Sequence, residues 1–128
     1  MAETDECPFC DALVDGSRVK LTTQHWFVVL DEYPVNKGHA LIVLKRHQPD
    51  FFLLTPIEWE CLGYTIDWTK NYLDQEFRSD GYNIGINCGE AAGQTIPHLH
   101  IHVIPRYKGD VENPRGGIRN FKTPLVPY

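Results

Sequence analysis

Three histidines alternate with aliphatic residues in the segment from His98 to Val103 (HLHIHV). Because successive side chains of a β-strand point to opposite faces of its sheet, the alternation predicts a strand with its aliphatic residues in the core. The histidines, His98, His100 and His102, are then expected to share the opposite surface. A strand with only one apolar face is typical of an antiparallel sheet that is covered on one side.

Other segments complete the predicted architecture. Two β-branched or aromatic runs, His25 to Leu30 and Gly38 to Leu44, predict a hairpin, and the alternating run Gly81 to Asn87 predicts another strand. The motif Thr55-Pro56-Ile57-Glu58 places a hydroxyl N-cap, a proline and a glutamate at the positions of a capping box. It predicts a helix of about 20 residues that ends near Phe77. Strands joined by short loops together with one long helix indicate an α+β fold.

Apolar residues recur along this helix at intervals of three and four. We assign them to packing: Ile57, Cys61, Leu62, Ile66, Trp68, Leu73 and Phe77.

Composition limits the class of protein. The chain has 128 residues, of which 42% are hydrophobic and 23% charged, which predicts one globular domain over residues 1–128. Prolines and paired glycines between Lys108 and Tyr128 predict an extended C-terminal tail over residues 108–128. A net charge of −5 argues against general nucleic-acid binding. The sequence lacks a membrane-length apolar run, and Met1 to Glu6 are acidic, so we expect a cytoplasmic protein without membrane contact.

The loop before the histidine strand, Asn87 to Thr95, is rich in small residues, backbone N–H donors and polar side chains. Such a turn suits phosphate oxygens, and neutral imidazole is a competent nucleophile near pH 7. Phosphorus chemistry is therefore the favoured hypothesis. Two alternatives stay open from the residues alone: an exposed strand face that carries histidines without function, and a metal hydrolase with all three histidines on zinc.

The segment Gly93 to Arg106 (GQTIPHLHIHVIPR) resembles the signature of the histidine triad family of nucleotide hydrolases and transferases. Gly38-His39-Ala40-Leu41 and Asn87 also match, and the resemblance covers residues 7–118. It is closest to short microbial members that open with Cys-x-x-Cys. The resemblance implies an antiparallel sheet of about five strands, one long and one short helix, and a homodimer.

The resemblance also implies a reaction and its residues. His100 would attack the α-phosphorus of a nucleoside 5′-phosphoramidate or a dinucleoside polyphosphate, and water would then release the mononucleotide from the nucleotidyl-histidine. His102 would contact the phosphate and assist the leaving group. The other implied catalytic residues are His98 and Gln94, and the implied residues for phosphate and ribose are Asn87, Gly93, Gln94, Thr95 and Asp31.

The spacing of Cys7 and Cys10 favours half of a tetrahedral zinc site, and a pair of free thiols is the alternative. The resemblance implies that His47 and His98 complete it. A zinc ion with four protein ligands has no open position for water, so the expected metal is structural.

Apolar residues near the amino terminus and first hairpin are expected to form the base pocket, with adenosine as the expected nucleoside. They are Phe9, Leu13, Phe27 and Val29. The alternative function is a nucleotide-binding adaptor with little turnover, but the intact nucleophile His100 favours the enzyme.

Overall fold

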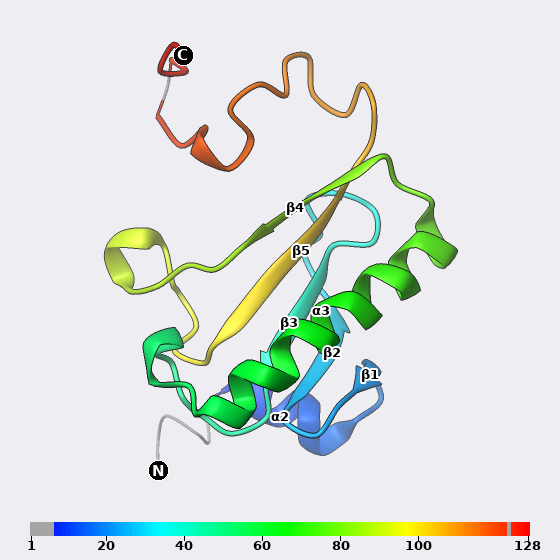
Figure 1. The fold of residues 1–128 in the computed structure, drawn as a ribbon, viewed down its shortest axis with the longest axis vertical. Coiled ribbons are helices and arrows are strands. Elements are labelled where there is room, and N and C mark those ends of the chain that lie inside the picture. The colour runs from blue at the N-terminus through cyan, green and yellow to red at the C-terminus, as the bar shows by residue number, and fades with distance from the viewer. Residues whose placement is uncertain (1–6, 123) are drawn as a thin grey trace.

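The computed structural model describes residues 7–122 and 124–128, so the acidic residues 1–6 lie outside the described residues. Five antiparallel strands form one sheet in the order β1-β2-β3-β5-β4 (Figure 1). The strands are β1 (Val19–Thr22), β2 (Trp26–Leu30), β3 (Ala40–Leu44), β4 (Gly81–Gly85) and β5 (His100–Arg106). The expected α+β fold is confirmed. Strand β1 escaped the residue patterns because it is a short, half-exposed edge strand.

In the described part of the chain, two α-helices pack on the sheet, the short α2 (Pro8–Asp15) and the long α3 (Pro56–Phe77). Helix α3 lies along one face of the sheet (Figure 1). Its Leu62 and Leu73 pack against strand residues that include Ile42 and Ile101. Helix α2 covers part of the other face and buries Phe9. Within residues 7–122 and 124–128, three short 3-10 helices follow strands or precede helices: η1 (Phe51–Leu53), η2 (Glu90–Ala92) and η3 (Gly117–Arg119).

Helix α3 begins where the capping box predicts. The Glu58 N–H donates to Thr55 Oγ1 at 3.3 Å, and the Thr55 N–H donates to Glu58 Oε1 at 2.9 Å. The buried Glu58 carboxylate also accepts two hydrogen bonds from Arg46, at 2.7 and 3.0 Å. This ion pair ties the first turn of α3 to the segment that follows β3.

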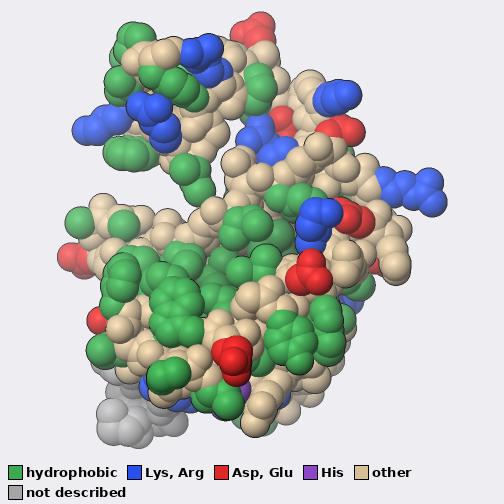
Figure 2. Space-filling view, viewed as in Figure 1, with side chains coloured by type: hydrophobic (Ala, Val, Ile, Leu, Met, Phe, Trp, Pro, Cys, Tyr) green, Lys and Arg blue, Asp and Glu red, His purple; other side chains and the backbone are tan. Residues whose placement is uncertain are grey.

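The packing assignment is wrong for two residues of α3. Ile57 is 52% exposed and Trp68 is 46% exposed, whereas Leu73 is completely buried. At 100° per residue, Ile57 and Trp68 lie beside the buried stripe rather than within it. Apolar side chains therefore gather on the outer surface around α3, as Figure 2 shows.

The histidine strand pairs with β3, with His100 opposite Val43 and His102 opposite Leu41. Both histidines therefore stand on the α2 face of the sheet, beside the second core cluster. Strand β5 begins at His100 and extends to Arg106, whereas the pattern predicted His98 to Val103. The His98 N–H instead bonds locally to Ile96 O at 2.8 Å, and Pro97 has no N–H, so the ladder begins later.

The turn before β3 needs a glycine. Gly38 has a φ of 88°, and a Cβ there would lie 2.8 Å from the Phe77 ring. The next residue, His39, immediately precedes β3, and its carbonyl oxygen accepts the Asp31 N–H at 2.9 Å.

The segment after β5 leaves the sheet and passes beside β4 at η3 (Figure 1). Its start is fixed by Asp110, which accepts hydrogen bonds from Arg106 at 2.8 Å and from Asn36 at 2.8 Å. Among the described helices, none has the length and apolarity needed to cross a membrane.

Candidate active site and metal centre

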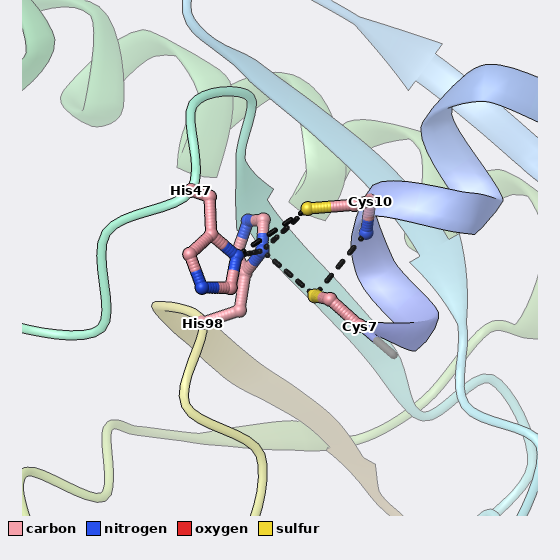
Figure 3. Close-up of side chains that lie close together, drawn as sticks. All are labelled: Cys7, Cys10, His47 and His98. Carbon is pink, nitrogen blue, oxygen red and sulfur yellow. Dashed lines mark hydrogen bonds between the residues drawn. The ribbon is translucent and has the colours of Figure 1, made fainter. Parts of the chain in front are cut away.

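Four potential metal ligands meet between the start of α2 and the residues before β5 (Figure 3). They are Cys7, Cys10, His47 and His98, and their ligand atoms all lie within 4.8 Å of one another. His98 Nδ1 lies 3.2 Å from Cys7 Sγ and 3.2 Å from His47 Nδ1. Cys10 Sγ lies 3.3 Å from His47 Nδ1 and 3.6 Å from His98 Nδ1. Residues far apart in the sequence thus form one compact group.

The hydrogen bonds determine which nitrogen of His98 faces this group. A carbonyl oxygen can only accept, so the 2.7 Å contact of His98 Nε2 with Leu44 O places the ring proton on Nε2. The lone pair on Nδ1 then points toward the two sulfur atoms. Burial lowers the pKa of His98, which keeps its imidazole neutral.

These residues fit a metal ion. Burial, together with the neighbouring Cys7, raises the pKa of Cys10 to about 11, so a cation is needed to stabilise a thiolate there. In a tetrahedral site with metal–sulfur and metal–nitrogen bonds of about 2.3 and 2.0 Å, ligand atoms lie roughly 3.5 Å apart. The observed separations of 3.2 to 3.6 Å are close to that value.

His100 stands at the start of β5 with a defined protonation pattern. Its Nδ1 lies 2.8 Å from the carbonyl oxygen of His98, so Nδ1 carries the proton and Nε2 keeps its lone pair. Burial lowers the pKa of His100, so the ring is neutral near pH 7. The Phe9 ring, 4.8 Å away between centroids, packs against it from α2. His100 therefore presents one nucleophilic nitrogen.

His102 is the last member of a chain of hydrogen bonds that runs from Val35 through His39. The Val35 N–H donates to His39 Nδ1 at 3.1 Å, so His39 carries its proton on Nε2. That nitrogen lies 3.0 Å from His102 Nδ1, which must accept. The remaining nitrogen of His102, Nε2, then carries a proton that it can donate. Burial, reinforced by His100 and His39, lowers the pKa of His102 to about 4.

Asp31 joins this chain, with Oδ2 3.5 Å from His39 Nε2 and Oδ1 accepting the Tyr33 N–H at 2.9 Å. Asp31, His39 and His102 also lie close enough to share a cation. A metal ion there would have to replace the Nε2 proton of His39, because Nδ1 already accepts from Val35. The geometry therefore favours a hydrogen-bond chain.

A pocket of about 420 Å³ opens in front of these groups. It brings together most of the predicted catalytic and substrate-binding residues: Phe9, Asp31, Asn87, Gly93, Thr95, His100 and His102. Phe27 lies instead in the buried cluster behind Phe9, with no exposed surface. The expectation that the three histidines share one open surface is wrong for His98, which is completely buried in the metal-ligand group. The three-histidine zinc site is not assembled either, because His98 and His102 face different clusters.

Gln94 points into a neighbouring hollow rather than into this pocket. Its Oε1 accepts the Gly89 N–H at 2.8 Å, and its Nε2 donates to Pro49 O at 3.0 Å. The Gln94 side chain thus connects the loop from Asn87 to Thr95 with the segment before η1.

Arg18 is a lining residue that the sequence patterns missed. Its Nη2 donates to Leu30 O at 2.8 Å, which places the guanidinium beside the residue before Asp31. Among the described residues that line the pocket, Arg18 is the one Lys or Arg. It belongs to no motif, and only the pairing of β1 with β2 brings it here.

The HIT domain family model matches residues 14–109, a span that leaves out Cys7 and Cys10. A bis(5′-adenosyl)-triphosphatase from Dictyostelium discoideum is 37% identical over 101 residues, which cover 79% of this chain and 68% of the relative. A HIT family protein from Bacillus anthracis superposes with a TM-score of 0.74 and 37% identity, covering 83% of this chain and 77% of that chain. A Zn-bound histidine triad family protein from Mycobacterium smegmatis gives a TM-score of 0.73 and 32% identity, covering 84% and 79%.

Proposed function

The chain belongs to the HIT domain family, and we propose that it hydrolyses nucleoside 5′-phosphate derivatives at the α-phosphorus through a nucleotidyl-histidine on His100. The observation that carries the proposal is the protonation pattern of His100. Its Nδ1–H is held by His98 O, which leaves the Nε2 lone pair for the pocket. The similarity to a bis(5′-adenosyl)-triphosphatase supports the same class of substrate.

In the proposed reaction, His100 Nε2 forms a bond to the α-phosphorus while the bond from phosphorus to the leaving atom breaks. The electron pair of that bond goes to the leaving atom, to which the Nε2–H of neutral His102 donates a hydrogen bond. A nucleotide leaves as its oxyanion, and an amine takes its proton from water. Water then attacks the nucleotidyl-histidine, loses one proton to the solvent and releases the mononucleotide, which restores the Nε2 lone pair of His100. His98 contributes by holding the Nδ1 proton of His100 through its carbonyl oxygen.

The other predicted site residues serve binding. Asp31 accepts hydrogen bonds from the ribose hydroxyls, and Asn87, Gly93 and Thr95 bind the phosphate. Gln94 contacts phosphate or leaving-group atoms only after its bonds to Gly89 and Pro49 rearrange. The Phe9 ring lines the base side of the pocket, and Phe27 supports it from the core. Adenosine is the proposed nucleoside.

The direct test traps the covalent intermediate. Diadenosine triphosphate and adenosine 5′-phosphoramidate are turned over separately, quenched without acid and analysed by intact and peptide mass spectrometry. An adenylyl adduct on the peptide that contains His100 is expected with each substrate that is cleaved. Rapid turnover with no adduct would refute covalent catalysis. Tight nucleotide binding without turnover would favour a nucleotide-binding adaptor instead.

We further propose that the four-ligand group holds structural zinc. Cys7, Cys10, His47 and His98 supply two sulfur and two nitrogen donors, a set that zinc binds tetrahedrally. When bound, zinc supplies a cross-link between α2 and the segment before β5. The Zn-bound relative from Mycobacterium smegmatis supports this assignment. Elemental analysis of purified protein is expected to give one zinc per chain.

We also propose a homodimer. Strand β4 is an edge of the sheet, and a small groove beside it is lined by Ile66 of α3, Tyr82, Ile84 and Val103. Exposed apolar side chains around α3 (Figure 2) would be covered by a second copy. Sedimentation analysis is expected to give twice the chain mass of 14.7 kDa.

Residues 1–128 are proposed to act as one domain, with residues 108–128 as its tail. A cytoplasmic location is proposed because the four cysteines form no disulfide among the described residues, and a thiolate metal site needs reduced sulfur. Expression with a fluorescent tag tests the location.

A further inference from the structure

A second hollow, of about 370 Å³, lies next to the candidate active site. Its floor and sides come from two segments, Pro49 to Phe52 around η1 and the loop residues Cys88, Gly89 and Gln94. None of the predicted roles except that of Gln94 involves this hollow.

The loop from Asn87 to Thr95 is shared by the hollow and the catalytic pocket. Asn87, Gly93 and Thr95 line the catalytic pocket, whereas Cys88, Gly89 and Gln94 line the hollow. The other wall is also coupled to the catalytic strand, because the Leu99 N–H donates to Gln48 O at 2.9 Å. Only one loop therefore separates the two spaces.

Phe52 gives the hollow an aromatic surface. Phe52 is 73% exposed, and its backbone is held because the Phe52 N–H donates to Asp50 Oδ1 at 2.9 Å. The Phe51 ring packs edge-on against it with centroids 5.3 Å apart, and Phe51 in turn packs on Trp59 at 4.9 Å. An exposed ring that is held in place from behind is suited to stacking with a planar ligand.

The charge of the lining indicates which part of a nucleotide fits. The described lining residues include the carboxylate of Asp50 but no Lys or Arg, so the hollow disfavours phosphate groups. A nucleobase is neutral, stacks on aromatic rings and offers N–H donors to carboxylate and amide oxygens. In the loop between the two spaces, the N–H groups of Gly89, Ala92, Gly93 and Gln94 already donate to acceptors within the loop. Asn87 and Thr95, which line the catalytic pocket, are the polar residues of this loop left to meet phosphates.

We infer that this hollow binds the nucleoside of the leaving group, so that a dinucleoside polyphosphate occupies the catalytic pocket and the hollow together. The inference rests on the proposed hydrolysis at the α-phosphorus and selects dinucleoside polyphosphates over phosphoramidates as the better substrates. Attack at phosphorus is in line, so the leaving group departs on the side away from His100. A chain of further phosphates can cross the loop, whereas the amine of a phosphoramidate is too small to reach the hollow.

The kinetic test compares two substrates of the full chain. Phe52→Ala is expected to lower kcat/KM for diadenosine triphosphate roughly 5- to 150-fold, the range for loss of one base–aromatic stack. For adenosine 5′-phosphoramidate the same variant is expected to stay within about twofold of the wild type. Phe52→Tyr keeps an aromatic ring at this position and should retain the wild-type kcat/KM for diadenosine triphosphate. Tyr64→Ala is the matched control. It removes an exposed ring outside the hollow whose centroid lies 5.3 Å from that of Trp68, the same spacing as between Phe51 and Phe52.

A binding test does not depend on turnover. Cys88 is exposed and lines the hollow, so its alkylation by N-ethylmaleimide reports occupancy. In the His100→Ala variant, diadenosine triphosphate is expected to slow modification of the Cys88 peptide, whereas AMP should not. If the wild type cleaves neither substrate, the proposed function fails, but this protection still tests the hollow.

Either of two results would overturn the inference. One is an equal effect of Phe52→Ala on both substrates, including no effect on either. The other is protection of Cys88 by AMP as strong as that by diadenosine triphosphate.

Discussion

Removing the His39 side chain tests whether the hydrogen-bond chain behind His102 sets its catalytic form. His39 is 3% exposed and does not line the catalytic pocket, so His39→Ala should leave the surface seen by the substrate unchanged. In the native chain, Val35 N–H, His39 and His102 Nδ1 are linked by bonds of 3.1 and 3.0 Å. Without His39, nothing holds the acceptor state of His102 Nδ1.

The size of the effect follows from that one bond. A buried neutral hydrogen bond contributes about 0.5–1.5 kcal/mol, and an acceptor left without a partner costs about 1–3 kcal/mol. If the cost of about 1–3 kcal/mol for the unpaired acceptor is lost from the transition state, kcat falls about 5- to 150-fold. Because the ground-state contacts remain, KM should change less than about threefold.

The assay is release of AMP from diadenosine triphosphate, with kcat and KM fitted separately and folding checked by thermal denaturation. His39→Gln offers an amide N–H to His102 and should recover part of kcat. His25→Ala is the histidine control, because His25 belongs to neither cluster. A folded His39→Ala variant with unchanged kcat, or with its loss confined to KM, would refute the role of the chain.

Three further predictions follow from the same structure. Burial lowers the pKa of the His100 imidazole, so its nucleophilic nitrogen stays unprotonated at neutral pH, and the acid limb of kcat/KM should lie below pH 6.5; a limb at pH 7 would contradict this. His100→Ala should reduce turnover by about 10³-fold or more while calorimetry shows AMP affinity within a few-fold of the wild type. The Arg46 guanidinium lowers the pKa of Glu58 to about 2, so the ion pair stabilises the fold above the unfolded-state pKa near 4.3 and loses this effect as pH falls toward 2. Because Arg46 is 43% exposed, Glu58→Gln should cost about 2 kcal/mol at pH 7 in urea unfolding and clearly less at pH 3; an equal cost at both pH values would exclude this linkage.

Local signals predicted the elements with strong patterns. The capping box located the start of α3, because two reciprocal hydrogen bonds within four residues fix that turn without help from the rest of the fold. The alternation in the histidine strand placed Leu99, Ile101 and Val103 in the core, where all three are buried. These features depend on nearest neighbours along the chain.

Other features depend on contacts that the sequence does not show. Ile57 and Trp68 match the helical period, but only the position of the sheet decides which edge of the stripe is covered. Arg18 reaches the pocket because β1 pairs with β2, with a register irregularity between Val19 and Leu21. The direction of the Gln94 side chain is set by partners at Gly89 and Pro49, and Pro49 is distant in the sequence.

The protonation pattern of the site could not be read from the motif either, and it explains why two of the three histidines have different tasks. The His98 imidazole donates to Leu44 O through Nε2 and turns Nδ1 toward the cysteines, while its carbonyl oxygen accepts the Nδ1 proton of His100. One residue therefore belongs to the metal-ligand group through its side chain and to the nucleophile through its backbone. The Phe9 ring of α2 lies 5.7 Å from the His98 ring and 4.8 Å from that of His100, and α2 itself begins between the two cysteines. A metal ion bound to these four residues would restrain the ring of His100 from two sides without touching it. After removal of the metal ion, activity should therefore fall at the same rate as α2 and the residues before β5 lose their structure, and no faster.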